Sequence, residues 1–231
     1  MRTTVFGLFL TILLLSLCAC GNAQTPSPQD SAAVSAVSSM HFGPPDYTTM
    51  EYDADGRLIR RNHHRGSDDY ISSYYIFEYD GDRLIRETQY SDPDHVSDYT
   101  EYKYDAEGRL LEIYHYDTYF GSSFVIEHDV NGNPIRTTSY KKDGSIRSVS
   151  EDEYDSRGNH IRTSLYLGDG SHDATRIFEY NDADQCILIA EYTADGSLFA
   201  YEIYEYAGEK CVRSIRYLAD GTKISDTKYE D

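Results

Sequence analysis

The sequence predicts an all-β fold: a single antiparallel meander of about 15 strands in seven repeats of about 26 residues, forming one twisted sheet, open or curled. A first series of aromatic positions recurs every 24–27 residues, at Tyr52, Tyr79, Tyr104, His128, Tyr154, Tyr180 and Tyr206. A second series recurs every 24–26 residues, at His64, Tyr90, Tyr116, Tyr140, Tyr166, Tyr192 and Tyr217. Two interleaved series indicate that each repeat contains two half-repeats.

Each half-repeat contains a turn sequence followed by a strand sequence. First halves read Tyr-Asp-x-x-Gly-x-x-Ile or close variants of it, as in residues 51–60, 78–86, 104–111 and 154–162. Second halves centre on Asp143-Gly-Ser145, Asp169-Gly-Ser171, Asp195-Gly-Ser197 and Asp220-Gly-Thr222. Asp closes turns with its own side chain, and Gly supplies positive φ. The runs between turns are rich in Tyr, Ile, Thr, Phe and Val, so we expect strands there.

Strand alternation predicts which side chains share a face. Five residues before each second-series position, and so on the opposite face, lies an aliphatic row of Ile59, Ile85, Leu111, Ile135, Ile161, Ile187 and Val212. Six residues before each second-series position, and so on the same face as that position, lie Leu58, Leu84, Leu110, Pro134, His160, Cys186 and Cys211. We expect this Tyr and Leu face to be the more buried one. The other face combines the aliphatic row with Glu51, Glu78, Glu127, Glu153, Glu179 and Glu205, a ladder broken by Lys103. The aliphatic row is anomalous there unless a bulge shifts the register.

The N-terminus has a different chemistry. A short apolar run precedes Leu17-Cys18-Ala19-Cys20-Gly21, a sequence that resembles the bacterial lipobox. This resemblance implies a signal peptide over residues 1–19, removed by cleavage, and a lipid on Cys20; an ordinary signal peptide is the alternative. Residues 20–46 are rich in small, polar and proline residues and read as a flexible tether. We therefore expect the repeat domain, residues 47–231, on the extracytoplasmic side of a cell membrane or outer membrane.

The charge of the chain narrows the range of partners. Acidic residues outnumber basic ones by 40 to 21, giving a formal net charge of −19. Such a surface repels nucleic acid and anionic membrane surfaces, so the lipid is the expected link to the membrane.

The repeats resemble the YD repeat of RHS-type proteins. The motif Tyr-Asp-x-x-Gly-Arg-Leu, followed a few residues later by Tyr, recurs between residue 50 and about 229. The resemblance implies a spiralling β-sheet and a cell-surface setting. Large members of that family form shells around a passenger; this array is too short for that role, and no toxin-like domain follows it.

No catalytic or metal constellation stands out, and we expect neither an enzyme nor a cofactor. The Asp-rich turns lack the Glu ligand of an EF-hand loop, and the Glu ladder is repeated, whereas a catalytic pair would be unique. His63, His64 and His128 read as drift within the repeat. Cys186 and Cys211 fall on next-nearest strands, about 9.5 Å apart. Because a disulfide needs Cα atoms about 4.4–6.8 Å apart, we expect two free, largely buried thiols.

The leading functional hypothesis is a non-catalytic binding or spacing module for a glycan or cell-wall polymer, with the oligomeric state open. Its candidate ligand face comprises Tyr90, Tyr116, Tyr140, Tyr166, Tyr192, Tyr217, Arg86, Arg136 and Arg162. Plain packing of these tyrosines and pairing of these arginines in a spacer is the competing interpretation. The alternative resembles choline-binding cell-wall repeats, although their cages depend on tryptophan, which this chain lacks. A glycan-active enzyme is the third hypothesis.

Overall fold

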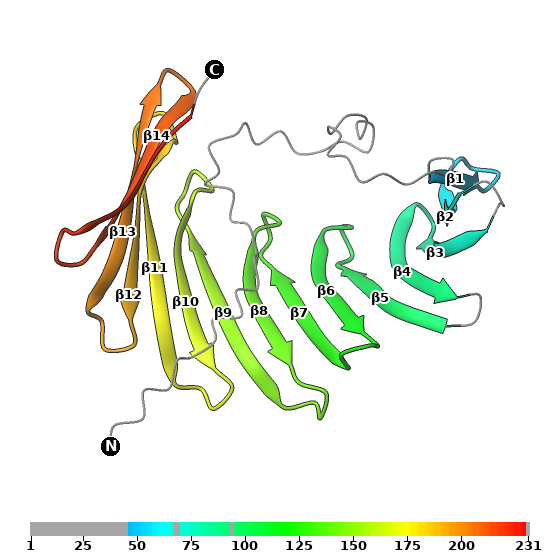
Figure 1. Ribbon diagram of the computed structural model, residues 1–231. Helices are drawn as coiled ribbons and strands as arrows, with labels where there is room; N and C mark the ends of the chain where they lie inside the picture. The colour runs from blue at the N-terminus through cyan, green and yellow to red at the C-terminus, as the bar shows by residue number, and fades with distance from the viewer. Residues whose placement is uncertain (1–45, 67–69, 93–94, 230–231) are drawn as a thin grey trace.

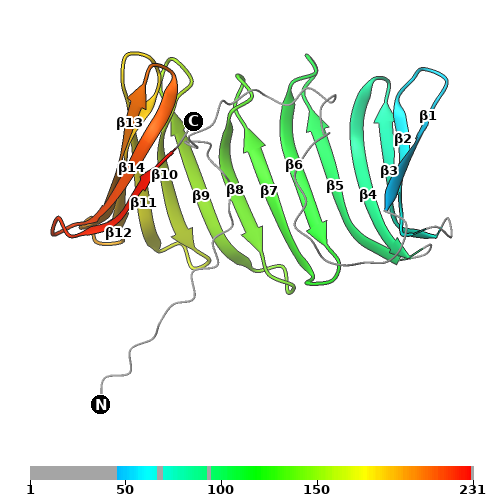
Figure 2. The same ribbon diagram turned by 45° about the horizontal axis from the view of Figure 1, so that its top comes forward.

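The computed structural model describes residues 46–66, 70–92 and 95–229. It confirms the predicted fold class: 15 strands form one sheet in sequence order, each antiparallel to the next. Figures 1 and 2 show the strands side by side in one curved layer. In the described part of the chain, β1 does not pair with β15, so the sheet is open. The predicted signal peptide, Cys20 and nearly all of the tether lie outside the described residues.

The strands are short and regular, and all contacts between elements join consecutive strands. Their bounds are β1 (Tyr47–Tyr52), β2 (Leu58–His64), β3 (Ile71–Asp80), β4 (Arg83–Asp92), β5 (His95–Tyr104), β6 (Leu110–Asp117), β7 (Ser122–His128), β8 (Pro134–Tyr140), β9 (Ile146–Tyr154), β10 (His160–Leu167), β11 (His172–Tyr180), β12 (Cys186–Thr193), β13 (Leu198–Ala207), β14 (Lys210–Leu218) and β15 (Lys223–Lys228). The described residues contain no helix long and apolar enough to cross a membrane.

Aspartate side chains organise the turns, as the sequence predicts. In the first turn, the Asp53 carboxylate accepts hydrogen bonds from the backbone N–H groups of Asp55 and Arg57, at 3.0 and 2.9 Å. Gly56 follows with a φ of +83°. The backbone hydrogen bond from Arg57 leads the causes that lower the pKa of Asp53. A backbone hydrogen bond also leads the causes that lower the pKa of Asp105 and Asp129. A neighbouring Ser or Thr side chain leads them at Asp143, Asp169, Asp195 and Asp220. At Asp155 the hydrogen bonds together outweigh burial, which opposes the lowering of its pKa.

The aliphatic row is explained by β-bulges. In the first hairpin Glu51 pairs with Arg60, but Tyr52 pairs with Leu58, so Ile59 is an extra residue without a partner across the hairpin. The same shift leaves every member of the aliphatic row as the extra residue of its hairpin. Repeated bulges bend and twist a sheet, which fits the curvature in Figure 1.

The bulges correct the expected face assignment. Residues paired across strands share a face, and each first-series ring pairs with a member of the Leu58 row: Leu58, Leu84, Leu110, Pro134, His160, Cys186 and Cys211. We call this the Leu face. The second-series rings were predicted to share a face with this row. That prediction is wrong, because the extra residue of each bulge reverses the alternation between the two positions.

The opposite face carries the Glu ladder and the second-series rings, and we call it the Glu–Arg face. Each position of the ladder, Lys103 included, lies opposite the residue two positions after the Leu58 row. We call these residues the Arg row, although two of the seven are not arginine: Arg60, Arg86, Glu112, Arg136, Arg162, Leu188 and Arg213. Each second-series ring follows its Arg-row position by four residues on the same strand. An even separation keeps the two on one face.

The first-series hydroxyls connect successive repeats, in what we call the hydroxyl ladder. Every first-series tyrosine after Tyr52 donates a hydrogen bond of 2.9 Å to the backbone carbonyl oxygen of the Leu58-row residue one repeat earlier. The bonds run from Tyr79 to Leu58, Tyr104 to Leu84, Tyr154 to Pro134, Tyr180 to His160 and Tyr206 to Cys186. This bond explains why the position is tyrosine rather than phenylalanine. Histidine at position 128 has no hydroxyl for it.

Burial is divided between the two faces, contrary to the expectation of one buried Tyr face. Val149, Ala190 and Ile215 are buried on the Glu–Arg face, and Phe178, Ala200, Cys186 and Cys211 are buried on the Leu face. The reason is that each strand contacts only its neighbours in the sheet, so the described residues form no second layer over either face.

The cysteines fit the expectation in part. Both Cys186 and Cys211 are buried, and the structure does not bond them to each other. The expectation of a thiol is wrong at Cys211, which is disulfide-bonded.

Candidate functional site

All nine residues of the predicted ligand face lie on the Glu–Arg face. The arginines of this face pair with glutamates of the ladder on the neighbouring strand. The distances between cross-strand charged groups are 3.7 Å for Glu51–Arg60, 3.7 Å for Glu127–Arg136, 3.9 Å for Glu153–Arg162 and 3.4 Å for Glu205–Arg213. Arg86 and Arg136 also reach a glutamate on the following strand, Glu101 at 3.2 Å and Glu151 at 3.7 Å.

These ion pairs are loose. The side chains of Arg86, Arg136 and Arg162 are 37, 47 and 46% exposed. Exposed pairs of this kind contribute about 0–1 kcal/mol each to stability. A ligand can therefore replace one partner of these ion pairs with little loss of folding stability.

The second-series tyrosines form cross-strand aromatic pairs at both ends of the sheet. The Tyr74 and Tyr90 rings are stacked with centroids 4.6 Å apart, and the Tyr201 and Tyr217 rings are stacked at 5.1 Å. Tyr116 contacts Tyr99 at 5.6 Å.

In the middle of the sheet, the second-series rings have smaller neighbours on one side, while on the other side Tyr166 meets the His172 ring edge-on, with centroids 5.6 Å apart. Across the strand, Tyr140 pairs with Ser123, Tyr166 with Val149 and Tyr192 with Thr175. The three rings are half-buried, so they present part of their surface to solvent without an aromatic cover from those partners.

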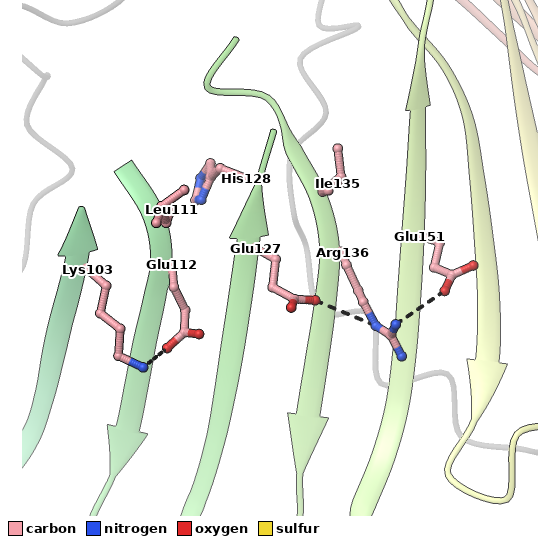
Figure 3. Close-up of a pocket in the computed structure, with 8 residues that line it drawn as sticks. All are labelled: Lys103, Leu111, Glu112, Glu127, His128, Ile135, Arg136 and Glu151. Carbon is pink, nitrogen blue, oxygen red and sulfur yellow. Dashed lines mark hydrogen bonds and ion pairs between the residues drawn. The ribbon is translucent and has the colours of Figure 1, made fainter. Parts of the chain in front are cut away.

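One pocket opens in the middle of the sheet, where Glu–Arg-face side chains meet the bulge residues Leu111 and Ile135 and the first-series position His128. It has a volume of about 540 Å³ and is lined from β5 to β9 by Lys103, Leu111, Glu112, Glu127, His128, Ile135, Arg136 and Glu151. Figure 3 shows Arg136 between two carboxylates, with dashed lines to Glu127 and Glu151, and Lys103 reaching Glu112. The hydrogen bond with Glu112 raises the pKa of Lys103.

The pocket lies where the repeat departs from its pattern. Lys103 replaces a Glu of the ladder, and Glu112, opposite it, replaces an arginine, so this pair has its charges reversed. In the next repeat His128 replaces a first-series tyrosine. Its Nδ1 is buried and has no hydrogen-bond partner among the described residues. Sequence reasoning treated His128 and Lys103 as separate irregularities and missed Glu112; only the strand register shows that they are neighbours.

The pocket combines charged groups with apolar surface. Three carboxylates accept hydrogen bonds, Lys103 and Arg136 donate them, and Leu111 and Ile135 supply apolar surface. The lining includes no serine, threonine or cysteine, so the common hydroxyl and thiol nucleophiles are missing from it. In the described part of the chain, no three His, Cys, Asp or Glu side chains are placed to hold a metal ion.

A second charged cluster lies on the Leu face near the N-terminal end of the sheet. Arg61 lies 3.8 Å from Glu87 and packs over the Tyr75 ring, with 4.3 Å between the guanidinium carbon and the ring centroid. Burial raises the pKa of Glu87 and of Asp98. Arg61 and His115 oppose the shift at Glu87. We interpret this cluster as packing, because the Arg61 guanidinium both pairs with Glu87 and lies over the Tyr75 ring.

The comparisons with known proteins give distant structural similarity. No family model matches the sequence, and no curated protein matches it. Solved structures that match include the TcdB2–TccC3 toxin complex, with 13% identity, a TM-score of 0.44, and coverage of 79% of this chain and 11% of that chain. The Photorhabdus luminescens Tc holotoxin pore has the same identity and TM-score, with 10% of that chain covered.

A porin-like protein from Bacteroides uniformis matches at 11% identity and a TM-score of 0.31, over 79% of this chain and 92% of that one. The chain spans about a tenth of the length of the two toxin chains described above. TM-scores at this level assign neither a family nor a function.

Proposed function

We propose that this chain is a non-catalytic binding module, held on the extracytoplasmic side of a bacterial membrane by a lipid on Cys20. Its Glu–Arg face binds a glycan or cell-wall polymer. The observation that carries the proposal is the common placement of the nine predicted residues: tyrosine rings and loosely paired arginine and glutamate groups recur on one face of an open sheet.

The geometry suits a repeating ligand. Strands lie about 4.8 Å apart, so equivalent side chains of successive repeats recur about every 9.5 Å across the sheet. A polymer lying across the strands would meet the same groups at each repeat, and weak contacts would add up through multivalency. Half-buried tyrosine rings provide flat apolar surface for sugar rings, while carboxylates and guanidinium groups can bond to hydroxyls.

The charge of the protein selects among polymers. A net charge of −19 disfavours strongly anionic glycans. Neutral or amine-bearing sugars are therefore the expected ligands. The pocket between β5 and β9, with three carboxylates against one lysine and one arginine, is a suitable place for a cationic substituent.

Binding to purified cell-wall and glycan fractions tests the proposal. The wild-type protein should be retained by at least one insoluble fraction, and the double variant Tyr140→Ala/Tyr166→Ala should be retained less. The matched control is Tyr119→Ala, which removes a ring that is 83% exposed in the β6–β7 turn. Equal retention of all three proteins, or no retention of any, would favour the spacer interpretation.

The lipid is tested separately. Intact-mass measurement of the protein extracted from membranes should show a diacylglyceryl modification, and Cys20→Ala should move the protein to the soluble fraction. An unmodified, soluble wild-type protein would favour the ordinary signal peptide.

A further inference from the structure

The open sheet leaves two edge strands with different protection. β1 and β15 both have six residues, and every one of them is exposed. Edge strands present unpaired backbone groups that can pair with another chain, and natural proteins block such pairing with charged residues.

β15 carries this protection. Three of its six side chains are charged, Lys223, Asp226 and Lys228, and the charged groups of Lys223 and Asp226 lie 2.8 Å apart. Asp226 also pairs with Arg213 on β14 at 2.8 Å. A strand approaching this edge would have to displace or desolvate these charges.

β1 lacks the same protection. Its sequence is Tyr-Thr-Thr-Met-Glu-Tyr, with Glu51 as its single charged residue. Met50 and Tyr52 are 52 and 57% exposed. Tyrosine and threonine favour extended strands, and the strand contains no proline that would prevent pairing.

The electrostatics of the first repeat indicate which partner fits. Residues 46–66 contain four acidic residues and four arginines, a net charge of zero, in a chain of net charge −19. The charged residues are Asp46, Glu51, Asp53, Asp55, Arg57, Arg60, Arg61 and Arg65. Although the chain as a whole is strongly acidic, a second copy meets no net charge at this edge.

We propose that β1 is a self-pairing edge, at which β1 of a second copy adds antiparallel to β1 of the first. A two-fold axis perpendicular to the sheet joins the copies into one continuous sheet, with both Glu–Arg faces on the same side. Residues that pair must share a face, so the axis passes at Thr49 or at Met50. In neither register does Glu51 lie opposite its own counterpart. The inference does not depend on the ligand of the Glu–Arg face.

Sedimentation equilibrium of the full-length protein over the micromolar range tests the proposal. The wild type should show a reversible monomer–dimer equilibrium. Met50→Lys places two like charges directly opposite each other if the axis passes at Met50 and diagonally across it if the axis passes at Thr49, so it should weaken dimerisation by about tenfold or more. The matched control is Ile224→Lys on β15, where the side chain is similarly exposed, at 53%; it should leave dimerisation unchanged.

A charge-exchange experiment distinguishes lost pairing from lost folding. Met50→Lys and Met50→Glu should each be monomeric, and an equimolar mixture of the two should recover association. A monomeric wild type at all concentrations would overturn the proposal. So would a dimer that Ile224→Lys disrupts and Met50→Lys does not, or a mixture that fails to associate.

Discussion

Replacing His128 with tyrosine should stabilise the sheet. Five first-series tyrosines donate a 2.9 Å hydrogen bond to the Leu58-row carbonyl oxygen one repeat earlier. At position 128 the equivalent acceptor is the Leu110 carbonyl oxygen, and histidine has no hydroxyl to reach it. The variant would complete the hydroxyl ladder across the middle of the sheet.

The magnitude follows from two contributions. One intramolecular hydrogen bond adds about 0.5–1.5 kcal/mol to the free energy of unfolding, and removing a buried polar atom without a partner adds about 1–3 kcal/mol. The Nδ1 of His128 is such an atom. We therefore expect His128→Tyr to raise the free energy of unfolding by about 2 kcal/mol. For a domain of this size, this corresponds to a rise in Tm of about 4–8 °C.

Thermal unfolding followed by circular dichroism at neutral pH is the appropriate assay. The matched control is His95→Tyr, which makes the same exchange at an exposed position at the start of β5, away from the hydroxyl ladder. It should leave Tm unchanged to within about 1–2 °C, as is usual for surface substitutions. If His128→Tyr did not raise Tm above the control, tyrosine at this position would not act through its hydroxyl, and the account of the ladder would be refuted.

Three further predictions use the same melting measurement. Tyr79→Phe should lower the free energy of unfolding by about 1 kcal/mol, because it removes the hydrogen bond to the Leu58 carbonyl oxygen; an unchanged Tm would contradict this. Tm should fall as the pH drops below about 4. The pKa of the turn aspartates is lower in the folded state than in the unfolded state. The stability that these carboxylates contribute is therefore present above their unfolded-state pKa and is lost as the pH falls through their folded-state pKa. A constant Tm down to pH 2 would contradict this prediction. Lys103→Glu should destabilise the sheet by about 0.5–1 kcal/mol, because like charges then face each other across β5 and β6. Adding Glu112→Arg should restore Tm, and equal Tm values for the single and double variants would argue against the pairing.

The fold was predictable because the signals repeat. Seven copies of the turn sequence and two aromatic series fix the number, order and direction of the strands, and the structure has the expected 15 strands. Local chemistry is enough for this level: Asp53 and its equivalents close turns whichever face their neighbours occupy.

The assignment of residues to faces was not predictable from alternation alone. The run from Leu58 to His64 reads as one uninterrupted strand, but Ile59 is an extra residue in the pairing with β1. A bulge depends on how the turn joins the two strands, and the sequence of one strand does not reveal it.

The candidate ligand face was predictable in part. The tyrosines and arginines were selected by their period, and their common placement holds because each ring follows its Arg-row position by four residues within one regular strand. The pocket was not predictable. Lys103 and Glu112 are nine residues apart in the sequence, and their charge reversal becomes visible only when the register places them opposite each other.

Titration calorimetry with a length series of oligosaccharides, cut from the glycan that the protein retains best, tests the central claim most directly. If equivalent groups on successive repeats contact one polymer, the affinity should rise with oligosaccharide length until the chain spans the sheet. The Tyr140→Ala/Tyr166→Ala variant should flatten that rise. An affinity that does not change with length, or a length dependence that the variant leaves intact, would contradict the proposal that the Glu–Arg face binds a polymer.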